Sequence, residues 1–305
     1  MTHLKSSGRL ERVLHDGGFA ITAETTPPLT ADPMKVVERT SVLSGLVHAV
    51  NVTDGAGARA HLCSFAAAHF MQAENGLEAV MQFTTRDRNK LALERDLLGV
   101  AGFAIPNVLC LSGDPLANGD EPDASAVNDV DSSGLVRLAT GLRDQGKLPS
   151  GREIETPPRY FVGVADMPID PPADWQPTGL LNKIEAGADF AQTQFCFDTE
   201  ILSRYIARLE EFAIPERLPL LIGLAPLASA KQARWMRENL FGTIIPDAVI
   251  NRLEAAENSH AEGRQICVEL MHAMKEMPGI AGVHLMGHQA ERQIAETLRE
   301  AGMEA

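Results

Sequence analysis

Aromatic side chains are scarce in this chain of 305 residues, at 5%, although 45% of the residues are hydrophobic. Such a composition suits the aliphatic interior of an α/β protein. No apolar run approaches the ~18 residues of a membrane span, and no charged-then-apolar leader opens the chain, so we expect a cytoplasmic protein with no membrane partner. Basic residues are also outnumbered, 27 against 41 acidic, and the formal charge of −14 argues against a nucleic-acid partner.

The chain has four widely separated cysteines, Cys63, Cys110, Cys196 and Cys267. None forms a Cys-x-x-Cys pair, and three lie in apolar runs, which predicts buried, reduced thiols. His284 and His288 are four residues apart on a strand and its following loop, where this spacing does not bring two ligands together as it does on a helix. We therefore predict no metal site.

Short apolar runs alternate with longer amphipathic segments along the whole chain. The runs are near-continuously apolar, as expected of parallel strands buried on both faces. There are eight of them: Phe19–Glu24, His48–Asp54, Glu78–Thr85, Asn107–Asp114, Arg159–Asp166, Phe190–Asp198, Pro219–Pro226 and Ala281–His288. This pattern predicts a single-domain α/β fold, a (β/α)8 TIM barrel over residues 1–305 with a short N-terminal helical extension at residues 1–18. A doubly wound open sheet is the alternative, weakened because no Gly-x-Gly-x-x-Gly follows a strand.

Capping residues mark where several helices begin. Asp32 before Pro33, Asp198, and Ser229 with Gln232 three residues later are helix-start signals. Residues 247–275 are expected to hold two helices before the last strand. The acidic stretch 114–134 is too long for a simple turn, and loops of that length are usually functional or disordered.

Polar residues end several of the predicted strands. In a barrel these positions meet at the carboxyl-terminal rim, where barrel enzymes carry their active sites. Glu24 stands before Thr25-Thr26-Pro27-Pro28, where no helix begins for it to cap. Asp114 follows Gly113, which lets the backbone come close to a ligand. Gln194 is an amide within an apolar strand and needs partners if it is buried.

These residues lie in motifs that resemble those of the methylenetetrahydrofolate reductase family. The segments are ITAETTPP, VNVTDGAG, TTRDRN, VLCLSGDP, KIEAGADFAQTQFCFD and LLIGLAPLASAKQ, in the family's order and spacing over roughly residues 19–301. The resemblance implies a (β/α)8 barrel that passes hydride from NAD(P)H through FAD to 5,10-methylenetetrahydrofolate, giving 5-methyltetrahydrofolate.

The resemblance also implies roles for the rim residues. Glu24 matches the acidic residue of the first-strand Glu-x-x-Pro-Pro pattern, implying a general acid that protonates N10 as the bridging methylene opens to an N5 iminium. A carboxylic acid holds its proton for such a task when burial favours the neutral form. For Asp114 the resemblance implies a contact with the folate that adjusts the electrostatics of the cationic intermediate. For Gln194 it implies hydrogen bonds to the pterin ring, and for Gln232 it implies a further contact with the substrate.

The flavin positions implied by the resemblance are less well matched. They fall on Thr53, Gln82, Leu111, Ser112, Gly113, Ala165, Met167 and Lys183. Lys183 would pair with a phosphate. Gln82 stands where well-studied members have His, Ser112 where they have Arg, and Met167 and Pro171 replace a Tyr and a His. Losing the arginine removes a bidentate phosphate contact.

The leading hypothesis is an NAD(P)H-dependent methylenetetrahydrofolate reductase-type oxidoreductase working through FAD, with NADH favoured because no basic cluster is evident for a 2′-phosphate. Three alternatives stay open: direct reduction by NADH without flavin, a pterin-binding methyltransferase-type barrel, and a non-catalytic folate-binding subunit. The direction of the reaction and a homo-oligomeric assembly are left open by the sequence.

Overall fold

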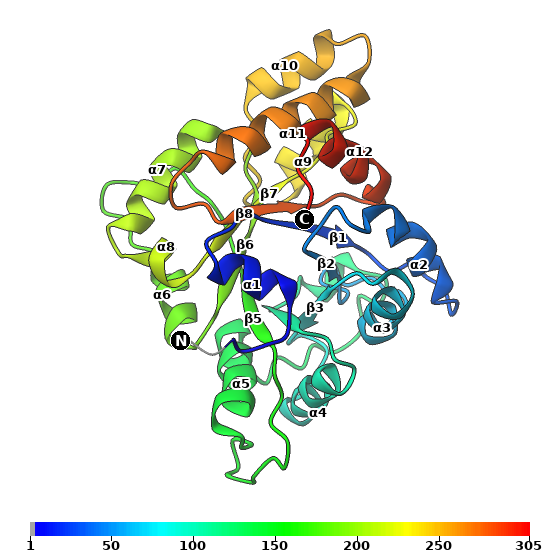
Figure 1. The fold of residues 1–305 in the computed structure, drawn as a ribbon, viewed down its shortest axis with the longest axis vertical. Helices are drawn as coiled ribbons and strands as arrows, with labels where there is room; N and C mark the ends of the chain where they lie inside the picture. Colours follow the sequence, from blue (N-terminus) through cyan, green and yellow to red (C-terminus); the bar gives the residue numbers. More distant parts are fainter. Residues whose placement is uncertain (1–3) are drawn as a thin grey trace.

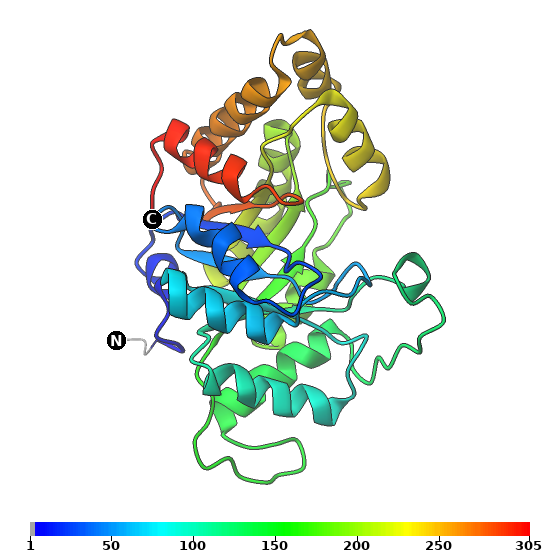
Figure 2. The same ribbon diagram turned by 90° about the vertical axis from the view of Figure 1, so that its right-hand side faces the viewer.

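Eight parallel strands form the centre of the protein in the computed structural model, which describes residues 4–305. They close into a barrel in chain order, with β8 pairing with β1. The strands are β1 (Ala20–Thr25), β2 (Ala49–Val52), β3 (Ala79–Thr84), β4 (Asn107–Leu111), β5 (Phe161–Asp166), β6 (Phe190–Phe195), β7 (Leu220–Leu224) and β8 (Gly282–Leu285). Helices surround them (Figures 1 and 2), so the predicted (β/α)8 barrel is confirmed.

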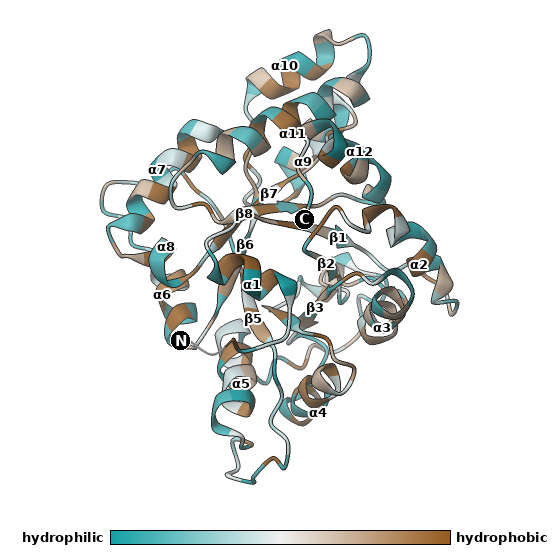
Figure 3. Cartoon of the chain, in the orientation of Figure 1, coloured by the Kyte–Doolittle hydropathy of each residue, from teal (hydrophilic) through white to brown (hydrophobic). Residues whose placement is uncertain are grey.

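The helices follow the strands in the expected alternation. They are α1 (Arg9–His15), α2 (Met34–Thr40), α3 (Ser64–Asn75), α4 (Lys90–Gly102), α5 (Ser132–Gln145), α6 (Thr178–Glu185), α7 (Thr199–Glu210), α8 (Ile214–Arg217), α9 (Ala230–Asn239), α10 (Asp247–Ala255), α11 (Ser259–Lys275) and α12 (Glu291–Ala301). Helices α10 and α11 are the two expected in residues 247–275. In Figure 3 the helices carry both brown and teal residues, and the buried apolar side chains of helices and strands form one core cluster.

Side-chain caps explain several helix starts. Asp198 accepts hydrogen bonds from the N–H groups of Glu200 and Ile201, and Ser229 accepts one from Gln232 at 3.1 Å, so both predicted caps are confirmed. Helix α2 begins at Met34, one residue after the predicted Pro33, although Asp32 caps the helix start as predicted. Pro33 is instead the residue before the helix, and Asp32 accepts from the Met34 N–H at 3.0 Å.

Helix α1 closes the amino-terminal end of the barrel and lies within the predicted extension at residues 1–18. Its Leu10 and Leu14 pack under an interior layer made by Ala20, Ala49, Val80, Leu109, Phe161, Phe190 and Leu221. The Glu78 carboxylate accepts the N–H groups of Arg9 and Leu10 at the start of α1. The opposite, carboxyl end of the barrel is therefore the end left for a ligand.

Three cysteines, Cys110, Cys196 and Cys267, are buried as predicted, and Cys63 is exposed. Burial raises the pKa of the Cys196 thiol to about 11, which keeps it protonated and unreactive near neutral pH. Within residues 4–305, no helix is long and apolar enough to cross a membrane.

Candidate functional site

The predicted rim residues share one side of the sheet. Side chains two residues apart along a strand point the same way, and the interior layer above fixes which way that is. Counting from that layer, six predicted positions face the barrel interior near its carboxyl end: Glu24, Thr53, Gln82, Leu111, Ala165 and Gln194. The strand pattern thus brings together residues from six strands at one mouth.

Glu24 is held by side chains from β3 and β8. Gln82 Nε2 donates a hydrogen bond to Glu24 Oε2 at 2.8 Å, and His284 Nε2 lies 3.8 Å from the same oxygen. The Glu24 side chain is 21% exposed, so it is largely removed from water yet reachable from the mouth. Gln82, predicted as a flavin contact, is here a direct partner of the predicted acid.

A buried polar network lies below Glu24 in the barrel interior. Asn51 and Gln192 exchange amide hydrogen bonds of 2.6 and 3.0 Å, and Gln192 Nε2 also reaches Thr22 Oγ1 at 3.1 Å. Thr22 Oγ1 is 2.9 Å from His284 Nδ1. All four side chains are buried. The network therefore links β1, β2, β6 and β8 to the histidine that faces Glu24.

Gln194 stands at the end of β6 with its amide partly used. Its Nε2 donates to the Phe241 carbonyl at 3.2 Å, and its Oε1 accepts from the Phe195 N–H at 3.0 Å. One N–H and one lone pair are left for a ligand. Gln232, the other predicted folate contact, has its Oε1 on the Ala228 N–H at 2.6 Å, so this side chain helps cap α9.

Asp114 lies on the loop after β4, where its side chain is exposed. Arg86 braces that loop: its guanidinium donates to the carbonyls of Gly55, Ala56 and Asp114 at 2.9–3.0 Å. Gly113 has φ +88°, and a Cβ there would lie 3.2 Å from the Arg86 side chain. The glycine therefore makes room for Arg86. Ser112 contributes its carbonyl, which accepts from the Arg86 N–H at 3.2 Å.

The long stretch 114–134 is tied to neighbouring loops. Its backbone N–H groups at Asp114, Asp120 and Val127 donate to the carbonyls of Ala56, Ala58 and Arg86. It projects at the right of Figure 2, at the end opposite α1. The stretch is thus an ordered part of the rim beside Asp114.

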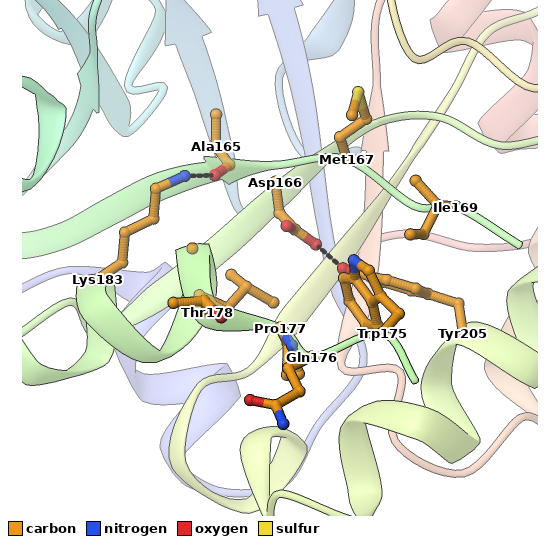
Figure 4. A pocket seen from close by; sticks show the side chains of 12 residues that line it. Ala165, Asp166, Met167, Ile169, Trp175, Gln176, Pro177, Thr178, Lys183 and Tyr205 are labelled. Carbon is orange, nitrogen blue, oxygen red and sulfur yellow. Dashed lines mark hydrogen bonds between the residues drawn. The ribbon is translucent and has the colours of Figure 1, made fainter. Parts of the chain in front are cut away.

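A cavity of about 480 Å³ opens between β5 and α6 (Figure 4). Three predicted flavin contacts line it: Ala165, Met167 and Lys183. Lys183 Nζ donates to the Ala165 carbonyl at 2.6 Å, and burial lowers the pKa of this amine. Tyr205 donates to Asp166 at 2.7 Å, and burial raises the pKa of that carboxyl group while this bond opposes the rise. The cavity thus carries one cation and one acid whose charges are costly to bury.

Thr53 Oγ1 is buried and has no hydrogen-bond partner among the residues that the structure describes. Since buried hydroxyls normally find a partner, this atom, one residue after the end of β2, is suited to a polar ligand. In the same described part of the chain, no group of three or more His, Cys, Asp or Glu side chains is placed to hold a metal ion.

Four residues of the interior network were missed from the sequence as site residues: Thr22, Asn51, Gln192 and His284. A signal was present. Each is a polar residue inside an otherwise apolar strand, in phase with the residues that face the barrel interior. Their mutual hydrogen bonds depend on strands far apart in the chain, and no local pattern reports them.

Comparisons with known proteins place the chain beside folate enzymes. A sequence model described as methylenetetrahydrofolate reductase matches residues 9–302. The chain is 24% identical over 263 residues to methylenetetrahydrofolate reductase 2 of Schizosaccharomyces pombe, covering 83% of this chain and 40% of that protein. It is 22% identical over 237 residues to a probable methylenetetrahydrofolate reductase (NADPH) of Caenorhabditis elegans, covering 75% of this chain and 33% of that protein. The chain thus spans less than half the length of these two curated relatives.

A solved structure shares the fold. An uncharacterized protein from Clostridium thermocellum, described as binding two copies of 5-methyl-5,6,7,8-tetrahydrofolic acid, has a TM-score of 0.62 at 15% identity. The match covers 96% of this chain and 97% of that one. At 15% identity the similarity shows a shared fold and nothing further.

Proposed function

The chain belongs to the methylenetetrahydrofolate reductase family, and we propose on that premise that it interconverts 5,10-methylenetetrahydrofolate and 5-methyltetrahydrofolate, with NADH as the hydride source. The observation that carries the proposal is the largely buried Glu24 carboxyl group, which faces the barrel mouth and bonds to Gln82. A neighbour with this fold is described as binding methyltetrahydrofolate, which supports a reduced folate as the ligand.

The reaction requires one proton, delivered to N10 of the folate. The bridging methylene of the substrate must open to an N5 iminium, and N10 must be protonated as its bond to carbon breaks. Glu24 supplies that proton and becomes a carboxylate. The hydride then adds to the iminium carbon. In the reverse direction Glu24 takes the proton back from N10.

Two other residues are proposed to hold the folate. Gln194 has one N–H and one lone pair left, which suits the pterin edge because that edge both accepts and donates. Asp114 is exposed on the rim, where its carboxylate would stabilise the cationic iminium. The brace from Arg86 fixes the backbone of that loop.

We propose the cavity between β5 and α6 as the place for the phosphate-bearing part of FAD. Lys183 lies in it with an ammonium group that burial disfavours, and a phosphate would offset this cost. Thr53 Oγ1, buried without a partner among the described residues, fits a polar edge of the bound group. When bound, FAD would accept hydride from NADH and pass it to the folate.

Direct transfer from NADH to the iminium is the second candidate. Lys183 is the one cationic side chain among the described residues that line the cavity. Ser112, where relatives carry an arginine, offers its backbone carbonyl to Arg86 and brings no charge. Both features weaken the positions proposed to hold the FAD phosphates and leave Glu24 unchanged.

The decisive experiment measures oxidation of NADH by methylenetetrahydrofolate with the purified protein, with and without added FAD. We expect turnover, and a fall of about a hundredfold or more in kcat for Glu24→Gln. Glu38→Gln, an exposed change on α2, should leave kcat unchanged. Binding of folate without turnover under both conditions would leave a non-catalytic folate-binding subunit as the function.

The absorbance spectrum and the FAD dependence of the same purified protein show which cofactor it uses. A flavin absorbance band in the purified protein, or activity gained on adding FAD, supports the flavin route. A colourless protein with full activity that added FAD does not change supports direct transfer from NADH. Transfer of the methyl group to a thiol or corrinoid, without NADH oxidation, would point instead to the methyltransferase-type reading.

A further inference from the structure

His284 is one of four polar residues at the centre of the barrel interior, where branched apolar side chains usually fill the space. With Thr22, Asn51 and Gln192 it is almost fully buried, and its ring faces Glu24. Buried polar groups cost free energy unless they are hydrogen-bonded, and these four side chains need one another as partners, which an apolar interior would not require. The arrangement therefore suggests a task beyond packing.

The hydrogen-bond donors of the network decide which ring nitrogen carries the proton. Gln192 Nε2 has two hydrogens, and the Asn51 oxygen at 3.0 Å and Thr22 Oγ1 at 3.1 Å accept them. Gln192 Nε2 is also 3.4 Å from His284 Nδ1, a longer contact. Thr22 Oγ1 is thus an acceptor toward Gln192 and has its own hydrogen to give.

That hydrogen has two acceptors within reach. His284 Nδ1 lies at 2.9 Å and the Val283 carbonyl at 3.3 Å, so the shorter contact favours Nδ1. A ring nitrogen that accepts carries no hydrogen in the neutral imidazole, and the proton is then on Nε2. The network therefore turns the N–H of His284 toward Glu24.

We propose that His284 is a positioning residue for proton transfer, holding Glu24 Oε2 so that Oε1 delivers the proton to N10 of the folate. The inference rests on the proposed function. Oε2 already accepts from Gln82 at 2.8 Å, and His284 Nε2 is 3.8 Å away on the same oxygen. No hydrogen bond to Oε1 is found among the described residues, so this is the oxygen that faces a ligand.

The step balances within the site. The O–H bond at Glu24 Oε1 breaks and an N–H bond forms at N10, while the C–N10 bond gives its electron pair to N10 and the N5 lone pair forms the C=N bond of the iminium. The negative charge left on Glu24 is then stabilised at Oε2 by the N–H groups of Gln82 and His284. Closing the 3.8 Å separation as charge develops would make the histidine bond stronger in the transition state than before it.

Two substitutions separate this role from packing. In His284→Asn the side-chain amide stands near the place of Nδ1, so it keeps an acceptor for Thr22 and loses the donor to Glu24. In His284→Gln the amide reaches the place of Nε2, so it keeps the donor, and Thr22 can turn to the Val283 carbonyl. His284→Asn therefore keeps only the role of Nδ1, and His284→Gln keeps only the role of Nε2.

We expect kcat to fall about tenfold to a hundredfold in His284→Asn, with the KM for the folate nearly unchanged, because the lost bond is made to a charge that forms during the reaction. His284→Gln should restore most of kcat. Equal losses in both variants, or full activity in His284→Asn, would overturn the proposal. A wild type that never oxidises NADH with the folate refutes the proposed function, and the inference falls with it.

A second measurement needs no turnover. Nitrogen-15 NMR of the histidine-labelled protein reports which ring nitrogen carries hydrogen, and the His284 signals are those that disappear in His284→Gln. We expect the Nε2–H tautomer in the wild type at neutral pH. An Nδ1–H tautomer would contradict the donor order and overturn the proposal, including in the case that His284→Asn does not fold.

Discussion

On one side of the barrel mouth, side chains from different strands bond to one another: Gln82 of β3 donates to Glu24 of β1, and His284 of β8 faces the same oxygen. On the β5–α6 side, Lys183 instead donates to a backbone carbonyl, and Asp166 is paired with Tyr205 of α7. The first region is arranged for its proposed task before any ligand arrives. In the second, the proposed function has Lys183 exchange its carbonyl partner for a cofactor phosphate. The proposal thus assigns proton transfer and cofactor binding to separate parts of the rim.

The largest effect is expected where the Asp114 side of the mouth is braced. Arg86→Ala removes the guanidinium hydrogen bonds to the carbonyls of Gly55, Ala56 and Asp114 and should lower the free energy of unfolding by about 3 kcal/mol. Urea denaturation measures this. Arg86→Lys, which keeps the charge but cannot reach all three carbonyls, should fall between the alanine variant and the wild type. An alanine variant as stable as the wild type would show that the brace contributes nothing.

An intermediate effect is expected on the cofactor side. Lys183→Met should weaken binding of FAD, or of NADH if no flavin is used, by about tenfold, through loss of a phosphate partner. The KM for the folate should stay unchanged, because Lys183 belongs to the other region. Titration with the cofactor and steady-state kinetics measure the two effects. Lys275→Met, on the exposed side of α11, is the matched control. A change in the folate KM with no change in cofactor binding would contradict the assignment of Lys183 to a cofactor region separate from the folate region.

The smallest effect concerns the pH dependence of stability. Burial raises the pKa of Asp166 in the folded protein above its value in the unfolded chain, so ionised Asp166 destabilises the fold. Asp166→Asn should therefore be more stable than the wild type at neutral pH. The advantage should disappear as the pH falls through the raised pKa of Asp166 toward its unfolded value, because the wild-type carboxyl group is then neutral too. Thermal unfolding across this range measures it, and a difference that does not vary with pH would contradict the assignment.

Much of the fold followed from local patterns. Near-continuous apolar runs predicted all eight strands, because strands buried on both faces need apolar side chains on both. Caps at Asp198 and Ser229 predicted where α7 and α9 begin, since a side-chain oxygen there satisfies N–H groups that the helix cannot. The start of α2 was off by one residue because a proline tolerates either position at a helix start.

The site was predicted less completely. Glu24 was singled out by its place before two prolines, a local feature. The partners of Glu24 come from β3 and β8, at Gln82 and His284, and their roles depend on closure of the barrel. Gly113 stays a predicted ligand contact, and the structure adds that its positive φ and its closeness to the Arg86 side chain also require glycine.

The sequence by itself indicated the eight strands, the alternation with helices and the family, because apolar runs and motif order are properties of the chain. Only the tertiary structure decided which polar side chains meet. Closure of the barrel places β8 against β1, so residues 260 positions apart in the chain, Glu24 and His284, come within 3.8 Å of each other. Hydrogen bonds act over a few ångströms, and no local pattern in the chain records a distance that short between its two ends.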